Sequence, residues 1–394
     1  MRISMISAAL VAALVGYGST IALVLSAAAA LNATAAQTAS WVFAICIAKA
    51  VGSAYLSFAH RIPVVLAWST PGAALIAATQ GITMPEAVGA FVFAGALIVL
   101  TGAVRPLGRL VALIPDGVAS GMLAGVLLPF CLKGSTAAQS LPALVFPMIA
   151  VFLLVRLKNP ALAVLAALGT GLILAFVTGA ANLPQLSLPL PTLRFISPEL
   201  RPDVLLALGL PLYLVTMASQ NLPGFATLRA AGYEPPVGPA LITTGGISAL
   251  AGLFGAHTVS MAAITAAICL GDETHPDRSQ RWKIGLVYAA FWVLLGMLGP
   301  VILPILAALP PALMAALVAL ALLGPLMGAM TGAFVPPQTR FAATVTLIIT
   351  ASGITATMVV PFFGATPTFS IGAPFLGLLA GLTVSAIERL RKNP

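Results

Sequence analysis

The chain has 394 residues, of which 60% are apolar and only 7% carry a charge. Soluble domains contain about 25% charged residues, so this composition excludes a water-soluble globule and predicts a polytopic membrane protein. The net charge of +9 does not indicate a nucleic-acid partner, because the basic residues stand singly between apolar runs. The lipid bilayer is the expected partner, and no cofactor or metal is predicted.

Apolar runs follow one another along the whole chain. A helix needs about 20 apolar residues to cross a bilayer, and shorter broken spans are allowed for. The first half, 1–197, predicts seven spans at 5–28, 38–58, 63–78, 86–104, 111–131, 141–156 and 161–179. The second half, 198–394, predicts seven more at 203–222, 238–254, 256–270, 283–306, 312–333, 340–355 and 371–387. The first run is longer than the roughly 7–15 apolar residues of a signal peptide, so we expect it to be retained.

The basic residues predict the orientation of these spans. With the N-terminus in the cytoplasm, fourteen Lys and Arg residues, Arg105 and Arg109 among them, fall inside, and three fall outside. Such an excess of positive charge on one side is the usual pattern of membrane proteins. Fourteen spans with both termini in the cytoplasm are therefore predicted.

The two halves resemble each other around residues 67–78 and 256–267, at an offset of 189. Both segments belong to the third span of their half, and five aligned positions are identical alanines. Because seven is an odd number, the second half enters the membrane from the opposite side. The repeat is then inverted, which is the architecture of many secondary transporters.

Both third spans contain a break that a simple membrane anchor would lack. Pro71 cannot donate a main-chain hydrogen bond, but it suits the first turn of a new helix. We therefore expect 63–69 to be extended and 71–78 to form a half-helix with Thr70 as its N-cap. A proline kink without further consequence is the alternative.

The second copy has the same character. Thr258 or Ser260 is expected to cap a helix that runs from Ala262 to Ile268. Inverted symmetry would make the N-termini of the two half-helices face one cavity. Each end carries partial positive charge and free N–H groups, which predicts a site for a small anion.

The ionisable residues also favour an anion over a cation. All nine Asp and Glu lie at or beyond predicted span ends, and Lys49 and His257 are the ionisable residues within spans. Ionisable residues are retained inside membranes mainly for function. The unperturbed pKa of histidine is about 6.5, so His257 is the first candidate for a proton carrier and Lys49 the second. A structural hydrogen bond or pairing is the alternative for each.

Polar residues gather at two further places. Ser219, Gln220 and Asn221 end the first span of the second half, and 17–20, YGST, interrupt the first span of the chain. Amide and hydroxyl groups are costly in lipid unless they face a cavity or partners. Together with the two broken spans, these segments are expected to enclose one site.

Two other groups of residues are expected to have structural rather than functional roles. The segment 271–277, with Asp272, Glu273 and Asp277, resembles a metal cluster in composition but is expected to be a solvated loop beside basic residues. The three cysteines lie far apart in apolar runs without metal-type spacing and are expected to be packing thiols.

Several strings are typical of one transporter family. They are SQNLPGFA at 219–226, FGAHTVSMAAITAAIC at 254–269, HPD at 275–277 followed by RW at 281–282, and AWSTPG at 67–72. On these strings, and over essentially its full length, the chain resembles the benzoate:proton symporter family, the BenE type. The resemblance implies proton-coupled import of an aromatic monocarboxylate such as benzoate across a bacterial inner membrane.

The resemblance also implies kinship with the nucleobase permease fold of seven plus seven inverted spans. In that fold, spans 1–4 and 8–11 form a core domain, and spans 5–7 and 12–14 form a gate domain. Spans 3 and 10 each contain a short strand and a half-helix. Nucleobase permeases carry glutamates in spans 8 and 10. Here Ser219 replaces the first, and no acid lies within 256–268, which agrees with an anionic substrate.

These considerations give one predicted site in an all-α, multi-pass inner-membrane protein. Its substrate-binding residues are expected to be Tyr17, Gly18, Ser19, Ser69, Thr70, Gly72, Ser219, Gln220, Asn221, Ala256, His257, Thr258 and Ser260, with His257 and Lys49 as proton-coupling candidates. The expected partners are a small aromatic carboxylate and a proton, and a homodimer is left open. A carrier of another small anion or of a nucleobase is the alternative within transport. An intramembrane enzyme would need paired acidic motifs, for which 272–277 is the sole candidate.

Overall fold

The computed structural model describes residues 2–104, 114–160, 162–185, 190–271, 274–335, 337–359 and 368–392. These residues fold mainly into helices. A helix satisfies its own main-chain N–H and C=O groups, which a bilayer interior requires because it contains no water. Arg105 and Arg109, which count toward the predicted cytoplasmic charge, and the acidic pair Asp272 and Glu273 lie outside the described residues.

The elements of the first half follow the predicted spans. They are α1 (Ile3–Gly18), α2 (Ile21–Ala30), α3 (Ala35–His60), β1 (Leu66–Trp68), α4 (Thr70–Ala77), α5 (Met84–Ala103), α7 (Asp116–Ser140), α8 (Pro142–Lys158) and α9 (Ala163–Val177). The first predicted span is divided into two helices, which hydropathy did not indicate. Ser19 and Thr20 form the break, and the Ser19 hydroxyl donates to the carbonyl of Gly16 over 3.5 Å.

The second half has a matching series. It comprises α10 (Pro202–Val204), η1 (Leu205–Gly209), α11 (Leu210–Thr216), η2 (Met217–Asn221), α12 (Leu222–Ala230), α13 (Val237–Gly252), β2 (Val259–Met261), α14 (Ile264–Leu270), η3 (Arg278–Gln280), α15 (Lys283–Met297), α16 (Gly299–Ala307), α17 (Pro311–Phe334), η4 (Pro337–Thr339), α18 (Arg340–Ala351), β3 (Thr355–Val359), β4 (Thr368–Gly372) and α19 (Ala373–Lys392). The antiparallel pair β3–β4 lies where hydropathy predicted only spans and their connection.

Seven helical segments among the described residues are long and apolar enough to cross a membrane, or eight if a bent pair counts as one span. That pair, Arg278–Met297 and Gly299–Ala307, bends by 58° within the predicted span 283–306. Each predicted span overlaps a helix or a strand followed by a helix. The multi-pass helical architecture is therefore present, whereas the count of fourteen crossings stays a prediction.

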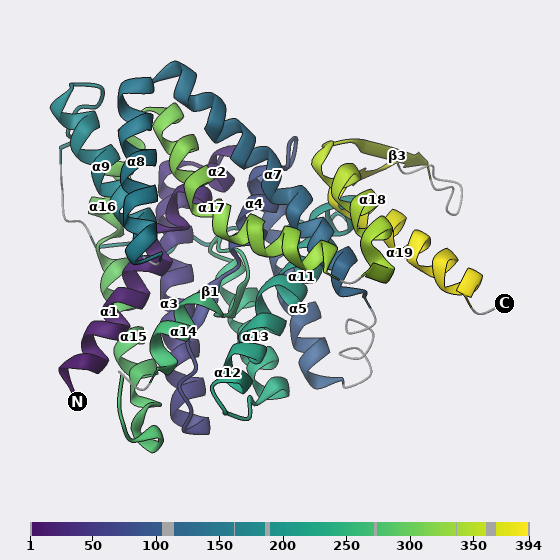
Figure 1. Ribbon diagram of the computed structural model, residues 1–394, viewed down its shortest axis with the longest axis horizontal. Coiled ribbons are helices and arrows are strands. Elements are labelled where there is room, and N and C mark those ends of the chain that lie inside the picture. The colour runs from purple at the N-terminus through teal and green to yellow at the C-terminus, as the bar shows by residue number, and fades with distance from the viewer. Residues whose placement is uncertain are drawn as a thin grey trace.

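The two third spans meet at the centre of the molecule. Strand β1 pairs with β2 in antiparallel register, so that Leu66 lies opposite Met261 and Trp68 opposite Val259. In Figure 1, β1 lies between α3 and α11, with α4 above it. Each strand is followed by a short helix, α4 or α14, as the broken sequence predicted.

The caps of these half-helices differ from the prediction. Helix α4 begins at Thr70, and its N-cap is Ser69, whose hydroxyl accepts from the N–H of Gly72 over 3.1 Å. Ser69 has the extended backbone that an N-cap requires. Helix α14 begins at Ile264 after Ala263, with no side-chain cap. Thr258 and Ser260 cannot cap it, because Ser260 lies within the strand and Thr258 directly precedes it.

The offset of 189 between the halves is also wrong in register. Strand β2 begins at 259, which is 193 residues after the start of β1 at 66. The matched alanines therefore reflect the alanine content of both segments rather than equivalent positions. The two strands are equivalent in another respect, because a serine of a neighbouring helix binds the first main-chain N–H of each strand. Ser53 of α3 accepts from the N–H of Leu66 over 3.0 Å, and Ser248 of α13 accepts from the N–H of Val259 over 2.8 Å.

The helices pack in two groups. In one group α5 packs on α13, α3 on α15, and α1 on α14 and α15; in the other, α7 packs on α17 and α18, α8 on α9, and α18 on α19. The first pair approaches closely, since a Cβ at Gly95 or Gly245 would lie within 3 Å of the facing main chain. Figure 1 shows α7 and α17 crossing over the centre, with α18 and α19 at one end and α8 and α9 at the other. The division into a core domain and a gate domain stays a prediction.

Candidate functional site

A cavity of about 550 Å³ lies between the two groups of helices, beside both half-helices. Its size is in the range of small-molecule sites. Its main polar and aromatic lining residues are Ser19, Thr20, Lys49, Trp68, Thr70, Asp116, Ser120, Ser219, Gln220, Thr265 and Tyr288. Apolar walls come from α7, α12, α14 and α17, through residues such as Leu123, Leu127, Leu222, Ile264 and Ala329.

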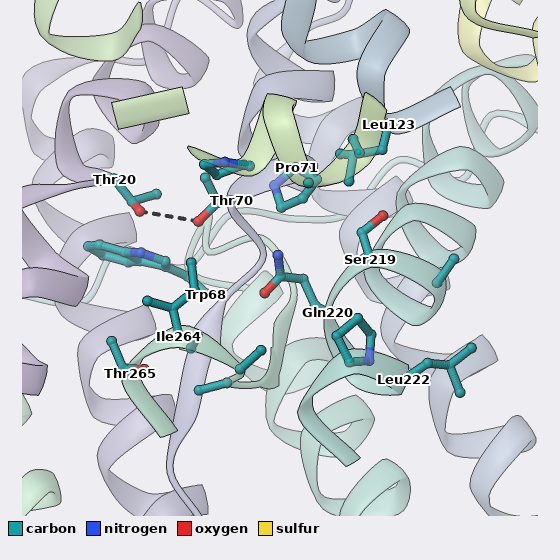
Figure 2. A pocket seen from close by; sticks show the side chains of 18 of the residues that line it. Thr20, Trp68, Thr70, Pro71, Leu123, Ser219, Gln220, Leu222, Ile264 and Thr265 are labelled. Atoms are coloured by element: carbon teal, nitrogen blue, oxygen red, sulfur yellow. Dashed lines mark hydrogen bonds between the residues drawn. The ribbon is translucent and has the colours of Figure 1, made fainter. Parts of the chain in front are cut away.

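The hydroxyl-bearing wall of the cavity is formed where α1 breaks and α4 begins. The hydroxyls of Thr20 and Thr70 are 3.1 Å apart and hydrogen-bonded, and Ser19 lies 3.5 Å from Thr20. Figure 2 shows this Thr20–Thr70 pair next to Trp68 and Pro71. The break in the first span thus brings two hydroxyls to the start of the half-helix.

The amide wall is formed by the π-helical turn η2. Ser219 and Gln220 both line the cavity, and neither side chain is hydrogen-bonded to another described residue. In Figure 2 the amide of Gln220 points to the side on which Trp68 and Thr70 lie. A π-turn adds a residue to the helical repeat and often marks a functional site. Here it turns Ser219 and Gln220 toward the cavity.

Lys49 is the only Lys, Arg or His residue among the described cavity-lining residues. It lies in the middle of α3 and is 1% exposed. Its Nζ lies 2.9 Å from the ring centroid of Trp292 and 4.4 Å from that of Trp68. Tyr17 and Tyr288 pack against these rings, with centroids 5.7 Å and 5.9 Å from Trp68 and Trp292 respectively. We refer to Tyr17, Trp68, Tyr288 and Trp292 as the aromatic cage.

Among the described residues, no carboxylate forms an ion pair with Lys49. Within the part of the chain that the structure describes, the ion pairs are those of Arg201 with Glu86 and with Asp203. Asp116 lines the cavity but forms no ion pair with Lys49. A buried ammonium without an anionic partner is unusual, because removal from water costs several kcal/mol. The cage offsets part of this cost through cation–π contacts.

The predicted site residues divide between the cavity and a layer behind it. Ser19, Thr70, Ser219, Gln220 and Lys49 line the cavity. The other predicted residues do not line it; these are Tyr17, Gly18, Ser69, Gly72, Asn221, Ala256, His257, Thr258 and Ser260. Tyr17 stands between, since it packs on two cage rings and its buried Oη has no hydrogen-bond partner among the described residues.

The layer behind the cavity holds the strands and half-helices in place. Thr216 donates to Ser69 over 3.0 Å and shares a hydrogen bond of 2.8 Å with Thr258. Asn221 accepts from the N–H of Met261 over 2.9 Å, and Ser260 donates to the carbonyl of Ala67 over 3.4 Å. These side chains satisfy main-chain and hydroxyl groups that a membrane interior would otherwise leave unpaired.

His257 belongs to this layer. Its Nδ1 accepts from the indole N–H of Trp41 over 3.0 Å, and the residue is fully buried. Its Nε2 is buried and has no hydrogen-bond partner among the described residues. His257 therefore lies within the protein interior, apart from the cavity surface.

Some lining residues were not on the predicted list of site residues, although Thr20 lies within the segment 17–20 that was expected to enclose the site. Thr20, Thr265 and Tyr288 line the cavity, and Trp292 lies against Lys49. Tyr288 and Trp292 are four residues apart and share one face of α15, but an aromatic pair at that spacing is usual in any helix core. Their contact with Lys49 depends on how α3 packs against α15, which the sequence does not show.

Outside the cavity, two groups of charges are engaged locally. The guanidinium of Arg201 donates hydrogen bonds to the carboxylates of Asp203 and Glu86, and these bonds, with Asp203 first, raise its pKa above the ordinary value. The hydroxyl and main-chain N–H of Ser279 lower the pKa of Asp277, which caps the 3-10 turn η3. Among the described residues there is no group of three or more His, Cys, Asp or Glu that could hold a metal ion.

The whole chain matches one family of known proteins. The family described as benzoate membrane transport protein matches residues 1–387. The chain belongs to this benzoate membrane transport (BenE) family. It is 39% identical to the inner membrane protein YdcO of Escherichia coli over 377 residues, which cover 95% of this chain and 93% of that protein. It is 34% identical to the benzoate membrane transport protein of Acinetobacter baylyi over 348 residues, or 88% of each chain.

Solved structures show where this BenE family member belongs among folds. The match to the transmembrane domain of the cyanobacterial bicarbonate transporter BicA covers 90% of this chain and 99% of that domain, with a TM-score of 0.59 at 16% identity. The match to SLC26A9 covers 98% of this chain and 66% of SLC26A9, with a TM-score of 0.61 at 13% identity. These likenesses support the predicted kinship with the nucleobase permease fold. The BenE family member is thus a multi-pass bacterial inner-membrane protein and a secondary transporter rather than an enzyme.

Proposed function

We propose that this transporter imports an aromatic monocarboxylate, benzoate or a close analogue, together with a proton, and that the substrate binds in the cavity beside Lys49. The observation that carries the proposal is a buried lysine without a carboxylate partner among the described residues, set among aromatic rings. A carboxylate would supply the missing partner. The family name of the Acinetobacter relative agrees with this substrate.

The carboxylate end of the substrate would meet three kinds of donor. Lys49 offers its ammonium, Thr20 and Thr70 offer hydroxyls, and Gln220 offers an amide N–H. The start of α4 adds the partial positive charge of a helix N-terminus. The Ser69 hydroxyl already occupies the N–H of Gly72, so the contribution of α4 is mainly its dipole and the Thr70 side chain.

The ring of the substrate would be buried among apolar side chains. Leu123, Leu127 and Ile264 line the cavity opposite or beside the polar wall. Burial of apolar surface contributes about 25 cal/mol per Å², so a benzene ring gains most of its affinity here. A second carboxylate on the substrate would have no cation to meet among the described lining residues, since Lys49 is the only one.

The proposal keeps the predicted domains and orientation. Spans 1–4 and 8–11 act as the core, spans 5–7 and 12–14 act as the gate, and both termini are cytoplasmic. The cavity lies between helices of both sets, because α3, α4 and α15 line one wall and α7 and α17 line another. Rocking of the core set against α7 and α17 would open the cavity to each side of the membrane in turn, as in other inverted-repeat transporters.

The test is uptake of labelled benzoate into proteoliposomes, with and without an inwardly directed proton gradient. The gradient should drive accumulation, and benzoate analogues with one carboxylate should compete. Succinate and other dicarboxylates should compete at least about tenfold less well, because one charge stays unpaired. Bicarbonate and uracil represent the alternative of a small anion or a nucleobase. Uptake of either one that benzoate does not inhibit would reject the proposal.

A further inference from the structure

The surroundings of Lys49 contain aromatic rings where a structural lysine would have an acid. Its Nζ faces Trp68 and Trp292. The ionisable side chains grouped around it are Cys46 on its own helix, Tyr17 on α1, Tyr288 on α15 and His257 before β2, and none of these is an Asp or a Glu. The cavity wall also holds one acidic residue, Asp116 of α7, which forms no ion pair with Lys49. The aromatic cage tolerates a cation but does not neutralise it.

Resting on the proposed function, we propose that Lys49 binds the proton and the carboxylate as one ion pair, and that the transporter reorients only when the Lys49 site has no net charge. In the loaded state, the ammonium and the carboxylate neutralise each other. In the empty state, Lys49 has released its proton and is a neutral amine. One lysine then serves both as the proton carrier and as the carboxylate-binding group.

The charges explain the coupling. A proton alone leaves a buried, unpaired ammonium, and a carboxylate alone leaves a buried, unpaired anion, each of which costs several kcal/mol. When both bind, each removes the cost of the other, so proton and substrate raise each other's affinity by the same factor. Symport follows without an acidic residue in the middle of the membrane.

The cycle balances in charge. The proton moves from outer water to the Lys49 amine as the carboxylate enters, and both leave on the inner side. One proton and one monocarboxylate cross together, and the unloaded carrier returns uncharged. Transport should therefore respond to the pH gradient and not to the membrane potential.

The hydrogen bond of His257 makes it less suited to carry this proton. The indole N–H of Trp41 can only donate, so the Nδ1 that accepts from it must hold a free lone pair. A doubly protonated ring would present N–H to N–H at that contact. His257 also does not line the cavity, so a proton on His257 could not contact the substrate directly.

The decisive variant is Lys49→Arg, because arginine keeps its proton at all relevant pH values. K49R should bind benzoate and exchange internal for external benzoate, since the loaded state is still neutral. It should lose net, proton-driven accumulation by at least about tenfold, because the empty carrier stays charged and cannot return. Lys133→Arg in α7, at an exposed lysine, is the matched control and should behave as the wild type.

Two further measurements hold even if K49R fails to insert. Benzoate binding to the wild type in detergent should take up about one proton per substrate at neutral pH, measured by calorimetry in buffers of different ionisation enthalpy. Lys49→Gln should weaken benzoate binding by roughly a hundredfold while its affinity for neutral benzamide is spared.

The outcomes separate the two proposals. If the wild type neither binds nor accumulates benzoate, the proposed function fails. If the wild type accumulates benzoate, the inference alone fails on any of three results. These are wild-type accumulation driven by membrane potential, binding without proton uptake, and net accumulation by K49R with the pH dependence of the wild type.

Discussion

The two broken segments have the same order of strand and half-helix but are built by different means. In segment β1–α4 the start of the half-helix is fixed by the segment's own side chains, since Ser69 caps the helix and Pro71 lies in its first turn, while Ser53 of α3 binds the strand. Segment β2–α14 has no side-chain cap and depends on neighbours, since Asn221 and Ser248 bind its strand. The two segments therefore share the order of strand and half-helix, while the residues that hold each half-helix start are different.

The copies also differ in what they present to the cavity. The first contributes Trp68 and Thr70, an aromatic ring and a hydroxyl. The second contributes small and apolar residues from Ala262 to Ile264, with Thr265 beyond them. The proposed polar end of the substrate thus faces the first copy, and an asymmetric ligand such as benzoate has one favoured orientation.

The largest effect is expected at the capped start of α4. A Cβ at Gly72 would lie 2.7 Å from Leu212 and 2.8 Å from the Ser69 hydroxyl. Gly72→Val should therefore displace the helix start, destabilise the protein by about 1–3 kcal/mol, and abolish benzoate uptake. Thermal unfolding in detergent and proteoliposome uptake measure the two effects.

The matched control lies at the other half-helix. Gly271 follows α14, and no atom lies within 4 Å of a Cβ built there. Gly271→Ala should leave uptake and stability close to wild type. Normal uptake by G72V would mean that the start of α4 is not part of the site.

The sequence predicted the architecture of this site better than its surface. Pro71 and Gly72 located the first break, and Lys49 was recognised as an ionisable residue in an apolar run, because both signals are local. Which neighbour faces the cavity was not predictable. Gln220 and Asn221 are adjacent amides, yet the π-turn η2 sends Gln220 to the cavity and Asn221 to the strand β2.

The aromatic cage is a second feature that the sequence alone could not predict. Its residues come from α1, β1 and α15, and their role as a cation site is recognisable only from the position of Lys49 of α3 among them. Tyr288 or Trp292 alone cannot be distinguished from ordinary core aromatics. The register of the repeat failed for a related reason, since alanine-rich segments match at many offsets and the serines that bind the strands, Ser53 and Ser248, lie outside the matched region.

A smaller effect is expected where the second copy departs from the first, at His257. His257→Gln should lose or weaken the Trp41 hydrogen bond and lower stability by about 1–3 kcal/mol. Because His257 does not line the cavity, the pH dependence of benzoate affinity should persist. Binding measured across neutral pH distinguishes the cases, and a flat profile in H257Q would make His257 the proton carrier in place of Lys49.

The smallest effect tests the caps themselves. Ser69→Ala should cost about 1 kcal/mol in stability, as the loss of an N-cap usually does. The reverse change in the other copy, Ala263→Ser, should gain almost nothing, within about 0.5 kcal/mol. The reason is the backbone: Ser69 has φ −74° and ψ 93°, the extended shape of an N-cap, whereas Ala263 has φ −107° and ψ −58°, which is helical. A serine at 263 would therefore not aim its hydroxyl at the free N–H groups of α14. Thermal midpoints of both variants in detergent provide the comparison, and a rise in A263S as large as the fall in S69A would show that the two half-helix starts are equivalent after all.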